Sequence, residues 1–200
     1  MRAAFGKAKA RLATGIGSTI AVGTATVYTI MGAGASAPVA QYDAGAPIEA
    51  GQWQVAAQRA WISTEKVYGV TPRPGQKALV LEADLSNRTR VSSRDYAKLF
   101  NPHPKPGVKL EPPVVTQLRD PQIGPLMHPG LGERVAFVWM MPDTAASPAT
   151  LELDVVAQTF KPIDNLYGTP GWFNPKVVGQ VELPVQGAAE PRPPAAGQGL

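Results

Sequence analysis

The chain has 200 residues, with 21 prolines, 20 glycines and no cysteine, which allows one ordinary domain plus extensions and excludes disulfides, thiolate metal sites and thiol catalysis. Its formal net charge is +4, and this excess equals the four cations of an N-terminal arm, Arg2, Lys7, Lys9 and Arg11, so the remaining chain is neutral. Because a nucleic-acid-binding domain carries a basic face on its folded part, we expect no nucleic-acid partner.

Residues 12–37 are predicted to form a transmembrane helix. No charged residue occurs from Leu12 to Tyr42, and this run exceeds the roughly 20 residues that a helix needs to cross a bilayer. The basic arm, residues 1–11, comes directly before it, so the positive-inside rule places the N-terminus in the cytoplasm and the rest of the chain outside. We therefore expect a single-pass protein of a bacterial cytoplasmic (inner) membrane, with a periplasmic or otherwise extracytoplasmic main domain.

A cleaved signal peptide is the alternative interpretation of this segment. The triplet Ala35-Ser36-Ala37 resembles a cleavage site, and removal after Ala37 or Ala40 would release a secreted structural protein. However, Pro38 follows the triplet directly, and the apolar run is longer than the roughly 7–15 residues of a usual signal core. These two features favour an uncleaved anchor.

The predicted helix is rich in small residues, which repeat at a spacing of four. Small residues at this spacing let two membrane helices approach closely. We therefore expect the helix to pack against an integral membrane protein within the lipid bilayer; the alternative is a signal-like segment that merely tolerates small residues. The residues concerned are Gly15, Thr19 and Gly23 on one face and Gly17, Ala21 and Ala25 on the adjacent face.

After a linker at residues 38–52, the pattern predicts an antiparallel β-sandwich over residues 53–185. Short stretches alternate apolar and polar residues and are bounded by Gly, Pro, Asn or Asp, which is typical of strands in a sandwich. The predicted strands are 53–61, 77–87, 133–142, 150–160 and 176–185, with shorter candidates at 108–110 and 114–118. The proline-rich stretches 101–113 and 121–132 are expected to be ordered connections.

Three local expectations follow from these patterns. In the first strand, Arg59 should lie on the same side as Trp53, Val55, Ala57 and Trp61, because all five fall at alternate positions. In the second strand, Glu82 and Asp84 alternate with leucines and should lie on a solvated face. A helical turn or two is expected within residues 92–100, where Tyr96, Leu99 and Phe100 could pack.

Two of the strands carry motifs. A "G-Q-x-x-L-V-x-x-x-x-L-x-N" strand contains Gly75, Gln76, Leu79, Val80, Leu85 and Asn87, and residues 132–142 fit "G-E-x-V-x-F-x-W-x-x-P" before an "L-x-L" strand. With the early aromatic strand, this order resembles membrane-anchored, immunoglobulin-like domains of unknown function found outside many bacterial membranes. The resemblance covers roughly residues 53–156. It implies an immunoglobulin-like sandwich and no particular activity.

The sequence contains no recognisable catalytic or cofactor motif. Its two histidines, His103 and His128, occur in proline-rich stretches without a second ligand at metal spacing, so we expect surface loop histidines. The sequence also lacks a G-x-S-x-G motif, a phosphate-binding loop and a dinucleotide fingerprint. We predict a non-enzymatic protein without metal or cofactor.

The stretch "DNLYGTPGWFNP", residues 164–175, is the candidate binding site. It combines three aromatic residues with turn-forming glycines and prolines, and a rigid loop loses little entropy when it binds a partner. Tyr167, Trp172 and Phe173 would form the contact surface. Alternatively, Trp172 or Phe173 folds back and closes the end of the sandwich.

These features together predict an accessory or binding subunit of a membrane-embedded complex. The alternative is an extracytoplasmic carbohydrate-binding module or hydrolase that uses residues 164–175. The C-terminal tail, residues 186–200, is low in apolar content and is expected to be disordered or extended.

Overall fold

A computed structural model describes residues 38–104, 108–164 and 168–187. These belong almost entirely to the second of two compact units, residues 1–38 and 39–200. The predicted membrane helix with its six small packing residues, Tyr167 and the tail beyond residue 187 lie outside the described residues. Within the described part, no helix is long and apolar enough to cross a membrane.

The described residues form nine strands and no helix, so this part of the chain is all-β, as the sequence predicts. The strands are β1 (Gln41–Tyr42), β2 (Ile48–Ala50), β3 (Trp53–Ser63), β4 (Gln76–Asn87), β5 (Phe100–Pro102), β6 (Val114–Gln117), β7 (Gly132–Pro142), β8 (Thr150–Lys161) and β9 (Gly171–Gln186).

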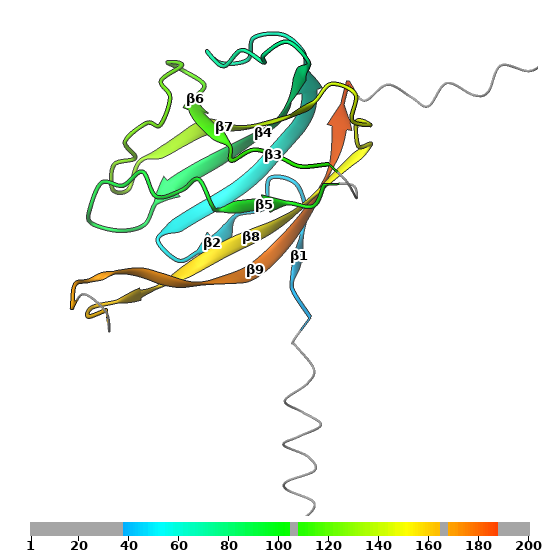
Figure 1. The fold of residues 1–200 in the computed structure, drawn as a ribbon. Helices are drawn as coiled ribbons and strands as arrows, with labels where there is room; N and C mark the ends of the chain where they lie inside the picture. The colour runs from blue at the N-terminus through cyan, green and yellow to red at the C-terminus, as the bar shows by residue number, and fades with distance from the viewer. Residues whose placement is uncertain (1–37, 105–107, 165–167, 188–200) are drawn as a thin grey trace, which may run out of the picture. The chain divides into compact units, whose positions relative to one another are not determined.

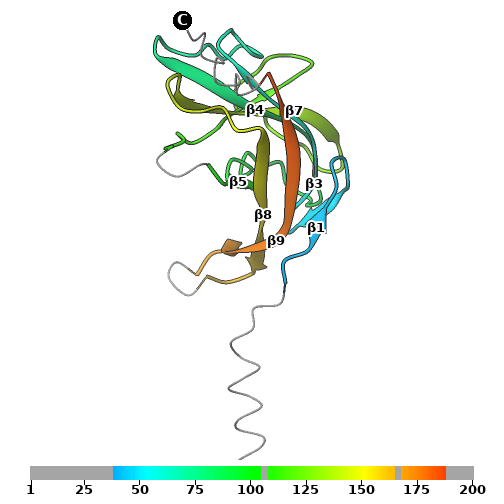
Figure 2. The same cartoon turned by 90° about the vertical axis from the view of Figure 1, so that its right-hand side faces the viewer.

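The strands form one curled sheet that folds into the two layers of a sandwich (Figures 1 and 2). One layer contains β5, β8, β9 and β1, and the other contains β2, β3, β4, β7 and β6. Strand β9 belongs to both layers. It pairs with β8 along most of its length, and its last residues pair in parallel with β3 through Ala60–Val185 and Trp61–Gln186.

The core lies between the two layers and follows the alternation that the sequence predicts. Apolar residues at alternate positions of each strand face inward, where they are removed from water. The ring of Phe137 is fully buried and packs edge-to-face against Phe100 at a centroid distance of 5.1 Å. Other inward residues are Val55, Leu81, Leu85 and Val135 from one layer and Leu151, Leu153, Val155, Val181 and Leu183 from the other.

Three stretches differ from the sequence-based expectation. Residues 38–52, predicted as a linker, contribute the short strands β1 and β2 to the sandwich. Within residues 92–100, residues 95–98 form turns instead of a helix and Phe100 begins β5, although Tyr96, Leu99 and Phe100 are buried as expected. Residues 108–110 form no strand.

The side-chain direction of Arg59 also differs from the prediction, because β3 contains a bulge. The pairing between β3 and β4 shifts between Ala57 and Arg59, and a bulge adds one residue and so reverses the alternation beyond it. Trp53, Val55 and Ala57 face the core, but beyond the bulge Ala60 takes the buried position. Arg59 therefore lies on the outer face, where it pairs with a carboxylate of β4.

We expect the Phe137→Ala substitution to lower the free energy of unfolding by about 3–5 kcal/mol, because it removes a fully buried ring that contacts both layers. Urea unfolding followed by circular dichroism would measure this change. Val91→Ala, at an exposed position, is the control and should leave stability within about 0.5 kcal/mol of wild type. A similar small effect at Phe137 would contradict the described core.

Candidate functional site

An open groove of about 700 Å³ lies on the outer face of the β5, β8, β9 and β1 layer. Segments far apart in the sequence form its walls: residues 41–43, His103, residues 150–153 and residues 180–184. Strands β8 and β9 expose their even-numbered residues here because the odd-numbered ones face the core. The groove is therefore a direct product of sheet register.

A chain of hydrogen bonds runs along the groove from β1 to His103, the residue that follows β5. Gln41 Nε2 donates to Gln180 Oε1 at 2.6 Å, and Gln180 Nε2 donates to Asp154 Oδ1 at 2.8 Å. The second Asp154 oxygen lies 2.8 Å from His103 Nε2. His103 is exposed outside the strands, as expected of a surface loop histidine, and it also has a defined partner.

Asp154 is the one carboxylate of this hydrogen-bonded chain, and 13% of its side chain is exposed. Burial by itself raises the pKa of a carboxyl group, but the hydrogen bonds from Gln180 and His103 outweigh it and hold the pKa of Asp154 below its usual range. Asp154 is therefore an anion at neutral pH. It fixes the two side chains that line the floor of the groove.

Two glutamates lie directly opposite each other on the groove's surface. Glu152 of β8 and Glu182 of β9 are register partners, and both are exposed. Like charges in this arrangement repel each other. Asp43 adds a third acid to the lining, and among the described lining residues His103 is the one basic side chain, with Nδ1 3.9 Å from Glu152 Oε2. The groove is consequently acidic.

The predicted aromatic site lies on a β-hairpin and not on an irregular loop. Strands β8 and β9 continue beyond the rest of their layer as a two-stranded ribbon, visible in Figure 1 in yellow and orange. Of residues 164–175, those from Gly171 onward belong to β9. The turn is closed by backbone hydrogen bonds from Asp164 N to Thr169 O and from Gly168 N to Asp164 O. Gly168 has a left-handed conformation with φ of 68°, which suits a turn-forming glycine.

Trp172 and Phe173 are both half-buried, so neither is a core residue nor a fully free contact. The Trp172 ring packs against Phe160, its cross-strand partner, at a centroid distance of 5.4 Å. It also covers Gly51, where a Cβ would lie 2.4 Å from a backbone oxygen of Gln158 and 3.3 Å from the Trp172 ring. Both aromatic residues border a second cavity of about 260 Å³.

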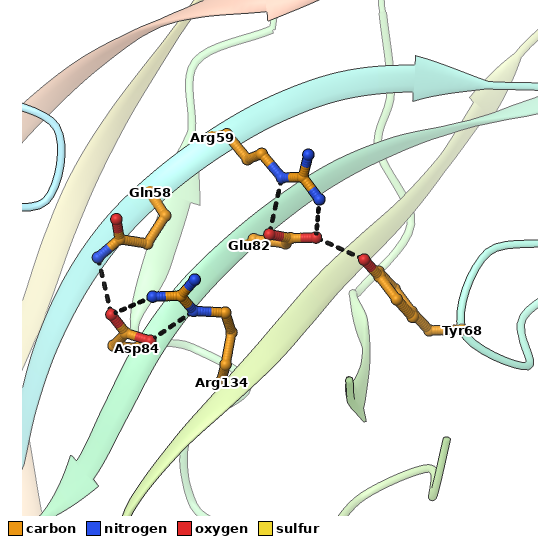
Figure 3. Close-up of polar contacts among 6 residues, drawn as sticks. All are labelled: Gln58, Arg59, Tyr68, Glu82, Asp84 and Arg134. Atoms are coloured by element: carbon orange, nitrogen blue, oxygen red, sulfur yellow. Dashed lines mark hydrogen bonds and ion pairs between the residues drawn. The ribbon is translucent and has the colours of Figure 1, made fainter. Parts of the chain in front are cut away.

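The described part of the chain also holds a polar cluster on the outer face of the other layer (Figure 3). Glu82 was expected on a solvated face, but its side chain is only 3% exposed because Arg59 and Tyr68 cover it. Arg59 donates to both Glu82 oxygens, at 2.8 and 2.7 Å, and the Tyr68 hydroxyl donates to the same carboxylate. Asp84, which is half-exposed, pairs with Arg134.

The turn that carries Tyr68 is held under backbone strain. Tyr68 has φ of 46° and Gly69 has φ of 83°, the geometry of a two-residue hairpin turn that normally favours Asn-Gly or Gly-Gly. Two features compensate for a tyrosine there: its hydroxyl bonds to Glu82, and its ring packs edge-to-face on Trp61. The turn covers the apolar outer surface formed by Ala78, Val80, Ala136 and Val138. We therefore assign this cluster a structural role.

Comparisons with known proteins add a likeness in fold. The described domain is a β-sandwich protein by its two packed layers and shared core. No protein family model and no curated protein matches the sequence. Among solved structures, the chain is similar to an uncharacterized beta-sandwich protein from Clostridium difficile 630, with 12% identity over 74% of this chain and 97% of that chain and a TM-score of 0.44.

The groove could not be predicted from the sequence, because its walls depend on which strands become neighbours. The alternating polar residues of β8 and β9 were visible as Glu152, Asp154, Gln180 and Glu182. Their register and the addition of β1, which was predicted as linker, were not. Of the predicted binding residues, the structure places Trp172 and Phe173 next to each other on β9.

We expect Trp172→Ala to lower the free energy of unfolding by about 1–2 kcal/mol, less than a fully buried ring would cost, because part of the side chain is already exposed to water. Chemical denaturation would measure the loss. Ile163→Ala, at an exposed position of the same hairpin, should have almost no effect. A loss as large as that of a core phenylalanine would show that Trp172 closes the fold instead of lying on its surface.

The Glu82 cluster predicts a specific pH dependence of stability. Burial raises the pKa of Glu82, but the hydrogen bonds from Arg59 and Tyr68 outweigh it, so the folded-state pKa lies below the unfolded value, which is about 4.3. The resulting stabilisation is fully present above the unfolded pKa and is lost as the pH falls through the folded pKa. Glu82→Gln should lower the free energy of unfolding by about 2 kcal/mol at pH 7. This value is near the lower end of the range for hydrogen bonds to charged groups, because 52% of the Arg59 side chain stays exposed.

Urea unfolding of both proteins between neutral and acidic pH tests this expectation. The difference in free energy of unfolding between wild type and Glu82→Gln should narrow as the pH drops below the pKa of the Glu82 carboxyl group in the unfolded state. Tyr68→Phe is the matched control: it removes one hydrogen bond, keeps the ion pair and should retain most of the pH dependence. A constant gap across the pH range would show that the charge of Glu82 does not contribute.

Proposed function

We propose that the protein is a non-enzymatic accessory subunit of a membrane-embedded complex. In this proposal residues 12–37 are an uncleaved helix that packs against a membrane partner, and an extracytoplasmic, immunoglobulin-like sandwich binds the same partner outside the bilayer. The groove over β1, β8 and β9 is the binding site of the sandwich. Its occupant is an extended, positively charged segment of the partner protein.

One observation supports this proposal above all: among the described residues, the acidic surface of the groove lacks a matching set of cations. Glu152 and Glu182 repel each other across the strand pair, and Asp43 adds to the same field. A lysine or arginine from a partner would relieve this repulsion and would be attracted to the site from solution. The neighbouring Gln41–Gln180–Asp154–His103 chain holds the groove in shape before binding, which lowers the entropy cost of association.

The proposal predicts that a stoichiometric integral membrane protein co-purifies with the full-length chain from its native membrane in mild detergent. The charge-reversed variant Glu152→Lys/Glu182→Lys should retain less of this protein, because attraction in the groove becomes repulsion. The helix variant Gly15→Leu/Gly23→Leu should also lose it, because the larger side chains keep two helices apart. Mass spectrometry and quantitative blotting of the purified material would measure both effects.

Asp143→Lys is the matched control for charge, since Asp143 is exposed in the turn after β7 and outside the groove. It should retain the partner like wild type. A wild-type chain that purifies alone, or that lacks its first 37 residues, would refute the proposal. If wild type and the groove variant retain the membrane partner equally, the groove is not the binding site for that partner.

A further inference from the structure

The exposed large apolar side chains of the described domain gather in three segments. These are residues 88–99 after β4, residues 118–131 before β7, and residues 159–164 and 168–176 of the β8–β9 hairpin. Six of the seven large apolar residues exposed in the described part occur here: Val91, Ile123, Leu126, Leu131, Phe160 and Ile163. Single exposed apolar residues are normal on a protein surface, but their concentration in three segments marks a surface that meets an apolar partner.

Strand directions place all three segments at one end of the sandwich. Ser86 at the end of β4 pairs with Gly132 at the start of β7. The last residue of β4 pairs with the first residue of β3. Strand β9 runs parallel to β3, so it begins on the same side as β3. The ends of β4 and β6 and the beginnings of β7 and β9 therefore lie on the same side.

Hydrogen bonds join the first two segments, and a shared cavity links residues 88–99 to the hairpin. Arg94 Nε donates to Gly124 O at 2.9 Å, and the buried Tyr96 hydroxyl donates to Pro125 O at 2.7 Å. Asp95 and Lys98 border the same 260 Å³ cavity as Trp172 and Phe173 of the hairpin. We call these three segments together the apolar–basic end.

The charge of this end differs from that of the neutral domain as a whole. The three segments contain seven basic residues, Arg88, Arg90, Arg94, Lys98, Arg119, Lys161 and Lys176, and three acidic residues, Asp95, Asp120 and Asp164. All seven basic side chains are exposed except Lys161, which is half-buried and lies over the Phe173 ring. The acidic groove lies on a different face, so the domain separates its charges.

We propose that the apolar–basic end binds the surface of an anionic phospholipid bilayer, with Phe160 and Ile163 of the hairpin at the level of the acyl-chain boundary. Ile163 is 68% exposed and Phe160 is 50% exposed, and apolar and aromatic side chains beside cations are the combination that partitions into this interface. The arginines and lysines of the neighbouring segments contact lipid phosphates, whose charge they complement.

The length of chain before the domain favours lipid as the occupant. The proposed anchor ends at residue 37 and β1 begins at Gln41, so the connecting residues span at most about 3.5 Å each. With residues 12–37 as the anchor of the proposed function, so short a connection would keep the domain within reach of the bilayer surface. The hairpin and the beginning of β1 both lie toward the lower side of the described domain in Figures 1 and 2. The inference thus rests on the anchor of the proposed function, but it needs no protein partner.

The absence of cysteine from the sequence allows a direct test with a single spin label. The full chain carrying Ile163→Cys, labelled with a nitroxide, is reconstituted into vesicles of phosphatidylethanolamine and phosphatidylglycerol. We expect the label to be accessible to oxygen and protected from a water-soluble nickel complex. Thr144→Cys, exposed in the turn after β7, is the control and should be accessible to the nickel complex.

Two comparisons separate lipid binding from burial of the label within the protein itself. The protection of the Ile163 label from the nickel complex should decrease in vesicles of phosphatidylcholine alone. It should also decrease when the protein carries Arg90→Glu and Lys176→Glu. It should not decrease with Lys66→Glu, which changes an exposed lysine outside the three segments. A label at Ile163 as accessible to nickel as the one at Thr144 would overturn the inference. Because the vesicles contain no other protein, protection at Ile163 supports it even if no partner co-purifies with the chain.

Discussion

The arrangement of the domain depends on the pairing of β9 with two different neighbours. Its main part forms an antiparallel ladder with β8, and its last residues form a parallel ladder with β3. Backbone hydrogen bonds must be satisfied when a strand is buried, so this double pairing curls one sheet into two layers and encloses the core. Because β9 also carries β1 on one side and extends into the hairpin, the groove and the apolar–basic end both depend on the path of this strand.

The charge distribution follows from the same sheet. Alternation along β8 and β9 directs apolar residues into the core and Glu152, Asp154 and Glu182 outward, which makes one outer face acidic. On the other layer the bulge in β3 turns Arg59 outward to neutralise Glu82. Seven basic residues collect in the segments of the apolar–basic end. A domain with no net charge therefore offers two surfaces of opposite sign, and we propose a protein partner for one and lipid for the other.

Much of the local structure could be predicted from the sequence alone. Alternation identified the long strands, and the burial of Tyr96, Leu99 and Phe100 was expected even though their segment forms turns instead of a helix. The bulge was not predictable, because the position at which the alternation of β3 reverses is decided by its pairing with β4. The candidate site was found in part: the sequence pointed to Trp172 and Phe173, but not to the groove, whose residues come from four separate segments.

The sequence by itself determined the composition limits, the uncharged N-terminal segment, the all-β class and the inward face of most strands, because each depends on residues close together along the chain. Tertiary structure alone decided the strand order, the use of residues 38–52 as strands, the burial of Glu82 and the projection of the hairpin. Each of these depends on which segments become neighbours. That choice is made by packing and hydrogen bonding over the whole domain, because the pattern of one strand is compatible with many partners.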